Sequence, residues 1–182
     1  LEVVLTKEIA SCLYAGVAGD TGIFRWMHPK PEDFRDAAEF VAAGADPVLI
    51  ATELYGRVTA EAINLKAEAL SNLEYYLDKQ VVFVTVTDEM CARHNANSKD
   101  GKDLVSMLRY IDGVLCSVYM RKEDNKWNVS FRSDANKLNV AEVASELGGG
   151  GHPAAAAFRR SGVEAEDLKK EIISIIKSKL KK

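Results

Sequence analysis

The stretch Val81-Val82-Phe83-Val84-Thr85-Val86-Thr87 decides the fold class of this chain. Its residues are apolar or β-branched, with no Gly or Pro among them, which predicts a strand buried on both faces. Before this run every segment has the apolar spacing of helices, whereas after it strands and helices are mixed. We therefore expect an α/β chain of the α+β type, in which helices precede a smaller unit built on a mixed sheet.

The first half of the chain is predicted to be helical. A helix capped by Thr6 is expected to end near Gly16, and the loop that follows would place Asp20 between two glycines. The pattern predicts three further helices, from Pro31 to Gly44, from Asp46-Pro47 to Gly56, and from Thr59 to about Leu77.

The second half is predicted to combine a β-hairpin with helices. Apolar and less apolar residues alternate over 114–120 and again over 127–131, with a polar turn between them. The pattern also predicts helices around 103–111, over 140–147 and from Leu168 onward, and a strand over 154–158. We place the domain boundary inside or just after the long helix, which gives domains of residues 1–75 and 76–182.

Composition and charge exclude several classes of function. The 182 residues carry 24 basic and 27 acidic side chains, a balance that disfavours a broad surface for long duplex nucleic acid. No apolar run reaches the roughly 18–20 residues of a membrane-spanning helix, and the first residues do not resemble a secretory signal. Three widely spaced cysteines form no Cys-x-x-Cys pair, which is typical of a cytoplasmic protein.

The segment Gly148-Gly149-Gly150-Gly151-His152-Pro153 is the first candidate site. Four adjacent glycines cost backbone entropy, so we expect them to allow close approach to a ligand, with bare N–H groups forming an anion-binding nest. They follow a helix C-terminus, whose partial charge is negative, so a phosphate would also need cationic side chains. His152 is one candidate, and Arg132, next to Ser133, is another. The alternative is a flexible turn with a surface histidine and an exposed arginine.

Asp20 is the second candidate. A carboxylate in a glycine-flanked loop can bind a hard cation such as Mg²⁺ or Mn²⁺, or it can cap a turn. A single aspartate does not make a metal site, so the residues alone leave both interpretations open.

Together these segments resemble the DHH phosphoesterases. Two stretches resemble the family's DHH-associated C-terminal domain: Arg132-Ser133, and the region from Asn139-Val140-Ala141 to Gly148-Gly149-Gly150-Gly151-His152 with Ala155-Ala156. Upstream, Leu13-Tyr14-Ala15-Gly16 followed by Asp20-Thr21-Gly22 and Phe24-Arg25 resembles the last metal-binding motif of the catalytic domain. The order is most similar to bacterial oligoribonucleases (nanoRNases), which also remove phosphate from adenosine bisphosphate and are sometimes labelled exopolyphosphatase-related.

This resemblance implies an Mn²⁺-dependent phosphoesterase that hydrolyses short oligoribonucleotides to mononucleotides. Asp20 would match one ligand of a two-metal Mn²⁺ centre, in which the metals generate hydroxide and stabilise the attacking and leaving oxygens. The substrate-binding side would consist of Arg132, Ser133, Gly149, Gly150, Gly151 and His152. The implied partners are short RNA or small nucleotides, and a homodimer is compatible with the sequence.

Two features depart from the family pattern. Ala157 stands where the Gly-His motif ends in glycine, and the chain contains no Asp-His-His sequence. The family's earlier Asp-containing motifs would precede Leu1. The chain thus resembles the end of a catalytic domain followed by its substrate-binding domain, and alone it is expected to hydrolyse little or nothing.

Two other interpretations remain. The chain could be a non-catalytic nucleotide- or RNA-binding module, because the C-terminal domain of alanyl-tRNA synthetase has a similar glycine run. The glycines could instead serve an oligomer contact. The sequence does not choose among nanoRNA, adenosine bisphosphate, cyclic dinucleotide products and single-stranded DNA.

Overall fold

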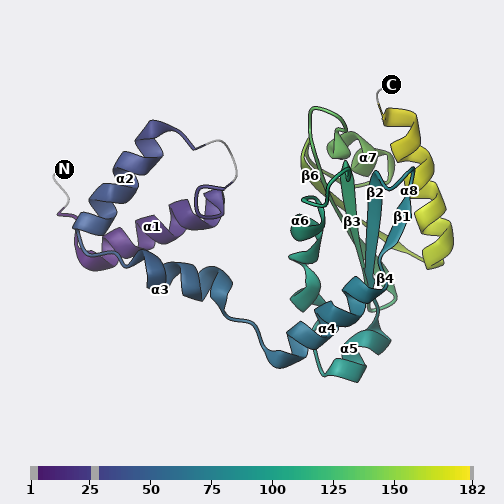
Figure 1. Cartoon of the computed structure of the whole chain (residues 1–182), viewed down its shortest axis with the longest axis horizontal. Coiled ribbons are helices and arrows are strands. Elements are labelled where there is room, and N and C mark those ends of the chain that lie inside the picture. Colours follow the sequence, from purple (N-terminus) through teal and green to yellow (C-terminus); the bar gives the residue numbers. More distant parts are fainter. Residues whose placement is uncertain (1–3, 26–28, 181–182) are drawn as a thin grey trace. The chain divides into compact units, whose positions relative to one another are not determined.

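The structure, a computed structural model, describes residues 4–25 and 29–180 (Figure 1). The chain forms two compact units, Leu1–Val58 and Thr59–Lys182. In the described part of the chain, no helix combines the length and the apolar character needed to cross a membrane.

The first unit is helical, as predicted. It contains α1 (Lys7–Thr21), α2 (Pro31–Ala42) and α3 (Pro47–Ala51), and α3 continues as a π-helical turn over Thr52–Gly56. Thr6 caps α1 and Asp46 caps α3, each by accepting hydrogen bonds from backbone N–H groups of the first turn. Its small core consists of Ala10, Tyr14, Ala18, Ala37 and Ala45.

The predicted end of the first helix at Gly16 is wrong, because α1 continues to Thr21. Gly22 ends the helix in the left-handed conformation, with φ of 57°, and its N–H donates to the carbonyl of Ala18. Gly16 therefore lies inside the helix, where glycine is tolerated at a modest cost in stability. As a consequence Asp20 lies in the last turn of a helix, not in a loop.

The second unit is built on a six-stranded mixed sheet of order β1-β2-β3-β4-β6-β5. Only β2 and β3 are parallel; the other neighbours are antiparallel. The strands are β1 (Glu74–Tyr76), β2 (Val81–Val86), β3 (Cys116–Glu123), β4 (Lys126–Ser133), β5 (Gly150–His152) and β6 (Ala155–Ser161). The buried β2, the β3–β4 hairpin and the α+β fold class are confirmed.

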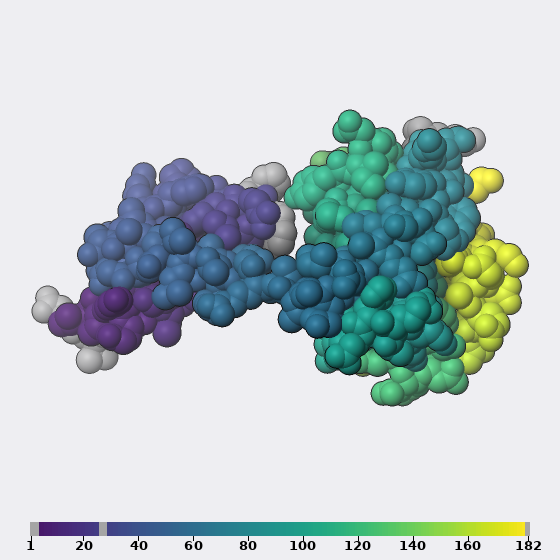
Figure 2. Space-filling model, turned by 60° about the horizontal axis from the view of Figure 1, so that its bottom comes forward, coloured from purple at the N-terminus to yellow at the C-terminus, as the bar shows by residue number. Residues whose placement is uncertain are grey.

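Helices cover one face of this sheet and part of the other. On the first face, α7 (Val140–Glu146) and α8 (Ala165–Lys179) pack against a core that includes Phe83, Phe131 and Phe158. Figure 2 shows α8 in yellow lying along the surface of this unit.

On the second face, a separate core joins β2 and Tyr119 of β3 to α4 (Ala60–Ser71), α5 (Asp88–His94) and α6 (Leu104–Leu108), and a 3₁₀ turn over Ser98–Gly101 lies beside α4. The buried residues of this second core include none from β4, β5 or β6. Within this unit, α6 also contacts β4, and the sheet is left open on this face from the outer side of β4 to β6 and β5.

The predicted helix from Thr59 to Leu77 is too long. Thr59 caps α4 as expected, but the helix ends at Ser71 and Glu74–Tyr76 forms the edge strand β1. Tyr75 and Tyr76 pair with Val82 and Val81, and aromatic residues favour such strand positions over a helix. α4 is part of the second compact unit, which begins at Thr59. The predicted boundary between a catalytic part, residues 1–75, and a substrate-binding part, residues 76–182, stays a prediction.

Candidate functional site

The uncovered part of the sheet carries three rows of cross-strand neighbours. Opposite residues of antiparallel strands share a face, and residues next to them along a strand point to the other face. Because Phe131, Ala156 and Phe158 point into the core beneath α7 and α8, their neighbours form the other face. We call it the open face; its rows are Arg132–Ala155–His152, Ser130–Ala157–Gly150 and Arg121–Asn128–Arg159.

The glycine run ends α7 and forms the edge strand of the open face. Gly148, with φ of 81°, donates its N–H to the carbonyl of Ser145 at 3.1 Å, and Gly149 donates to Ala144 at 2.7 Å. These two N–H groups therefore point back into the helix. The prediction that the run presents bare N–H groups as an anion-binding nest is wrong for these two residues.

Close packing of β5 on β6 explains why two of the glycines are needed. A Cβ atom on Gly149 would lie 2.2 Å from the carbonyl oxygen of Ala157, and one on Gly151 would lie 2.5 Å from that of Ala155. A Cβ atom on Gly150 would meet no other atom within 4 Å. The run thus brings an exposed strand edge, Gly150–His152, alongside β6.

Arg132 is a half-buried cation without a carboxylate partner among the described residues. Its Nη1 donates to the carbonyl of Phe131 at 2.8 Å. Burial lowers the pKa of Arg132, and the positive charge of Arg109 adds to that effect. Since arginine starts from a pKa above 12, the side chain stays charged at neutral pH. An unpaired, partly desolvated guanidinium favours an anionic ligand.

His152 ends the same row on β5. Its side chain is exposed, and no described residue forms an ion pair or hydrogen bond with it. Between His152 and Arg132 only the methyl group of Ala155 intervenes. The row therefore offers two side chains that can donate hydrogen bonds, with only the short side chain of Ala155 between them.

Ser133 does not reach the open face. Its side chain points to the opposite side of β4 and is 1% exposed. The Oγ atom donates to the carbonyl of Leu138 at 2.8 Å and lies 3.2 Å from the carbonyl of Pro153. Ser133 thereby holds Pro153 in place next to His152, which is a positioning role.

Ala157, the departure from the family motif, lies in the middle of the open face. It is exposed and sits between Ser130 on β4 and Gly150 on β5. Its side chain is a single methyl group, only slightly larger than the glycine of the family motif, so the face stays shallow here.

The segment around Asp20 belongs to the first unit. Asp20 is exposed in the last turn of α1, and the Tyr55 hydroxyl donates to the neighbouring carbonyls of Ala18 and Gly19, at 3.2 Å each. The next residues, 22–24, all have φ near 57°, and the Thr21 hydroxyl accepts the Phe24 N–H at 2.9 Å. Left-handed conformations in non-glycine residues are strained, and such strain is concentrated at functional sites.

The described residues do not by themselves fit a metal ion. None of their His, Cys, Asp and Glu side chains form a group of three or more that could hold one. The Asp20 carboxylate supplies at most two of the roughly six oxygen ligands that a hard divalent cation takes. Over residues 4–25 and 29–180, Asp20 therefore belongs to no such group.

The open face also contains a groove that we did not predict from the sequence. It has a volume of about 250 Å³ and lies over β3, β4 and β6, where its polar lining consists of Arg121, Asn128, Ser130 and Arg159. The alternation of polar Asn128 and Ser130 with buried neighbours on β4 was the available signal. Arg159 was missed because the predicted strand stopped at Phe158, whereas β6 continues to Ser161.

Comparison with known proteins identifies the family. The model of the DHHA1 domain matches residues 67–182, which include all six strands. The chain belongs to the DHHA1 domain family. The open face, the glycine run and the groove all lie within the DHHA1 match.

Two named relatives of this DHHA1 chain are enzymes of oligoribonucleotides or nucleotides. It is 28% identical over 180 residues to the bifunctional oligoribonuclease and PAP phosphatase NrnA of Thermus thermophilus, covering 99% of this chain and 53% of the relative. It is also 28% identical over 171 residues to the cyclic-di-AMP phosphodiesterase PdeA of Listeria monocytogenes, covering 93% of this chain and 25% of that protein.

The chain is also similar to a solved structure. The exopolyphosphatase-related protein of Bacteroides fragilis superimposes with a TM-score of 0.87 at 25% identity, over 95% of this chain and 51% of that protein. The chain spans about half the length of the NrnA relative and of this structure. The resemblance to oligoribonucleases and exopolyphosphatase-related proteins is confirmed.

Proposed function

We propose that the intact protein is an Mn²⁺-dependent DHH phosphoesterase that hydrolyses short oligoribonucleotides and removes phosphate from adenosine bisphosphate. In this proposal the DHHA1 part of the chain binds the substrate. The observation that carries it is the row Arg132–Ala155–His152, in which an unpaired guanidinium and an exposed imidazole flank a methyl-lined floor.

This row suits a terminal phosphate group. The planar fork of Arg132 can donate two hydrogen bonds to one phosphate, and His152 can donate a third from β5, on the other side of β6. The helix C-terminus that precedes the glycine run repels an anion, so the two side chains supply the attraction. The low floor of Ala155 and Ala157 leaves room for a sugar or a base. We assign Ser133 to holding the backbone beside His152, and Gly149, Gly150 and Gly151 to forming the edge strand.

Asp20 is proposed as one ligand of the metal centre. Its carboxylate lies in the last turn of α1, where the partial negative charge of the helix end adds to the attraction for a cation. The remaining ligands would come from outside these 182 residues. When bound, two Mn²⁺ ions supply a hydroxide nucleophile and neutralise charge at phosphorus.

The protein is proposed to act in the cytoplasm on short substrates. The net charge of −3 disfavours binding of long duplexes through many phosphates at once. A short oligonucleotide needs few phosphate contacts, which a single row of side chains can provide.

Hydrolysis of a 5′-phosphorylated RNA dinucleotide tests this function. The full-length gene product and the 182-residue chain are assayed side by side, each with Mn²⁺ and with a chelator. We expect mononucleotide release by the full-length protein with Mn²⁺ only, and little or none by the 182-residue chain. If neither protein turns over substrate, the phosphoesterase proposal fails.

A non-catalytic binding module is the second candidate. It is favoured because Arg132 and His152, the two groups proposed to bind the ligand, both belong to the DHHA1 part, whereas Asp20, the one proposed metal ligand, belongs to the other unit. Nucleotide binding by the full-length protein without any turnover would decide for this alternative.

A further inference from the structure

We propose that the groove lined by Arg121, Asn128, Ser130 and Arg159 is a second anion-binding subsite, which takes the next phosphate of an oligonucleotide whose terminal phosphate lies at Arg132 and His152. This inference rests on the proposed function of the open face. It implies that the chain itself selects oligonucleotides over mononucleotides.

Arg159 supplies the free positive charge of the groove. It is exposed on β6, lines the groove, and has no ion-pair partner among the described residues. Arg121 is different, because its Nη2 lies 3.2 Å from Oε2 of Glu123 and its Nη1 donates to Oγ of Ser98 at 3.2 Å. Arg121 is therefore held in place and largely neutralised, so an incoming anion would pair with Arg159.

The next residue along β6 shows that this arrangement is specific to Arg159. Arg160 points to the opposite face of the sheet, where its guanidinium contacts Glu171 of α8 at 3.3 and 3.4 Å. The two arginines are adjacent in sequence, yet only Arg160 has a structural partner. The groove thus contains a guanidinium, that of Arg159, which forms no ion pair with any described residue.

Neutral polar groups complete the subsite. Asn128 and Ser130 of β4 line the groove, and their side chains form no hydrogen bond with any other described residue. An amide and a hydroxyl can bind sugar hydroxyls or phosphate oxygens next to a guanidinium. Polar groups without a protein partner along a cationic groove favour a polar, anionic ligand over an apolar one.

The two proposed subsites lie at different places along the sheet. Arg159 lies four residues along β6 from Ala155, the cross-strand partner of Arg132. At about 3.3 Å per residue this is roughly 13 Å along the strand, so the two arginines leave the sheet at separate positions. Arg132 and His152 do not line the groove. A ligand with two phosphates can reach both subsites, but a mononucleotide occupies only one.

Calorimetric titration of the 182-residue chain separates the two subsites. The ligands are 5′-AMP and a 5′-phosphorylated RNA dinucleotide, without metal. Arg159→Ala is expected to weaken binding of the dinucleotide about tenfold, the loss of one charge-assisted hydrogen bond, and to change binding of 5′-AMP by less than about twofold. The matched control Arg160→Ala removes the same charge from the other face and should leave both affinities within about twofold.

The outcomes distinguish this inference from the proposed function. His152→Ala should weaken both ligands, and if it does not, or if the wild-type chain binds neither, the proposed function fails and the subsite with it. If His152→Ala weakens both ligands but Arg159→Ala affects both equally or neither, only the second subsite is refuted. Arg159→Lys keeps the charge and should recover part of the dinucleotide affinity. Circular dichroism of each variant checks that the fold is retained.

Discussion

Gly149 and Gly151 determine how closely β5 approaches β6. Each would place a Cβ atom within 2.5 Å of a backbone oxygen, and backbone atoms cannot move away as the end of a flexible side chain can. Two glycines of the run are thus required by packing, and the exposed edge that we propose as a ligand-binding edge results from it. Gly150 lies between them, and a Cβ atom at this position would have free space.

Gly149→Ala should lower the free energy of unfolding by about 2–3 kcal/mol, because the new methyl group overlaps the carbonyl of Ala157. The measurement is urea-induced unfolding followed by circular dichroism. Gly150→Ala is the matched control and should leave stability unchanged or raise it by up to about 1 kcal/mol. Equal effects of the two substitutions would contradict the packing explanation.

Ser133→Ala should lower the free energy of unfolding by about 1–3 kcal/mol, because it removes the donor that satisfies a buried carbonyl at Leu138. Ser130→Ala, on the open face of the same strand, should change it by no more than about 0.5 kcal/mol. Thermal unfolding of both variants tests this. A smaller loss for Ser133→Ala than for Ser130→Ala would be inconsistent with the positioning role.

At the scale of elements, the sequence predicted the strands and helices whose patterns are local. The buried run at β2, the β3–β4 hairpin and α8 followed from periodicity and turn residues. The edge strand β1 could not be predicted, because three residues with helix-compatible spacing become a strand only by pairing with β2. The groove arises for the same reason: it joins residues of three strands that only the register of the sheet brings together.

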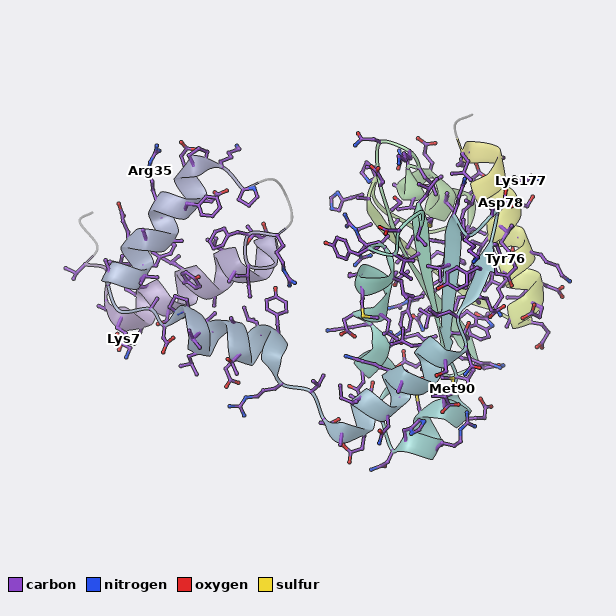
Figure 3. All side chains as sticks on the ribbon, in the orientation of Figure 1. Lys7, Arg35, Tyr76, Asp78, Met90 and Lys177 are labelled. Carbon is purple, nitrogen blue, oxygen red and sulfur yellow. The ribbon has the colours of Figure 1, made fainter. Side chains whose placement is uncertain are left out.

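Glu74 links β1 to α8, because it accepts hydrogen bonds from both Tyr76 and Lys169. The Tyr76 hydroxyl donates to Oε2 of Glu74 at 2.7 Å, and Lys169, whose side chain is only 7% exposed, donates to Oε1 of Glu74 at 2.6 Å and to Glu166 at 2.8 Å. Figure 3 shows Tyr76 at the edge of the sheet beside α8. Burial and the hydrogen bond to Glu74 raise the pKa of Tyr76 to about 12.

The raised pKa predicts a loss of stability at alkaline pH. The folded state holds the proton more tightly than the unfolded state, whose tyrosine pKa is about 10. The stabilisation by Tyr76 is therefore complete below about pH 10 and lost as the pH rises towards 12. Wild type should exceed Tyr76→Phe in unfolding free energy at pH 7, and the difference should vanish by about pH 12.

Tyr75→Phe is the control for this series. Tyr75 is the exposed neighbour on the same strand, and its hydroxyl has no hydrogen-bond partner among the described residues. This variant should match wild type in urea-induced unfolding at each pH. A difference between wild type and Tyr76→Phe that stays constant from pH 7 to 12 would refute the linkage.

At the scale of the whole molecule, the two units divide the proposed roles. Asp20 lies in the helical unit and the open face in the DHHA1 unit. The motifs led us to propose Asp20, Arg132 and His152 as site residues from the sequence, although Asp20 was predicted to lie in a loop and lies in a helix. The metal centre itself could not be predicted in full, because one carboxylate is the only candidate ligand that the motifs assign within these residues.

Asp20→Asn in the full-length protein should reduce Mn²⁺-dependent hydrolysis of the dinucleotide by at least about 100-fold, because it removes a charged metal ligand. Binding of 5′-AMP to the 182-residue chain should change by less than about twofold in the same variant. Asp36→Asn, which neutralises an exposed carboxylate on α2, is the control for charge. Full activity in Asp20→Asn would remove Asp20 from the metal centre.

The central claim is that the open face of the sheet binds the nucleotide, and an NMR titration of the ¹⁵N-labelled 182-residue chain with the 5′-phosphorylated dinucleotide tests it most directly. We predict that the amide signals that shift most belong to Arg132, Gly150, His152, Ala155 and Arg159, with those of α8 and β1 unchanged. Shifts confined to α8, β1 or the helical unit, or no shifts at millimolar ligand, would contradict it.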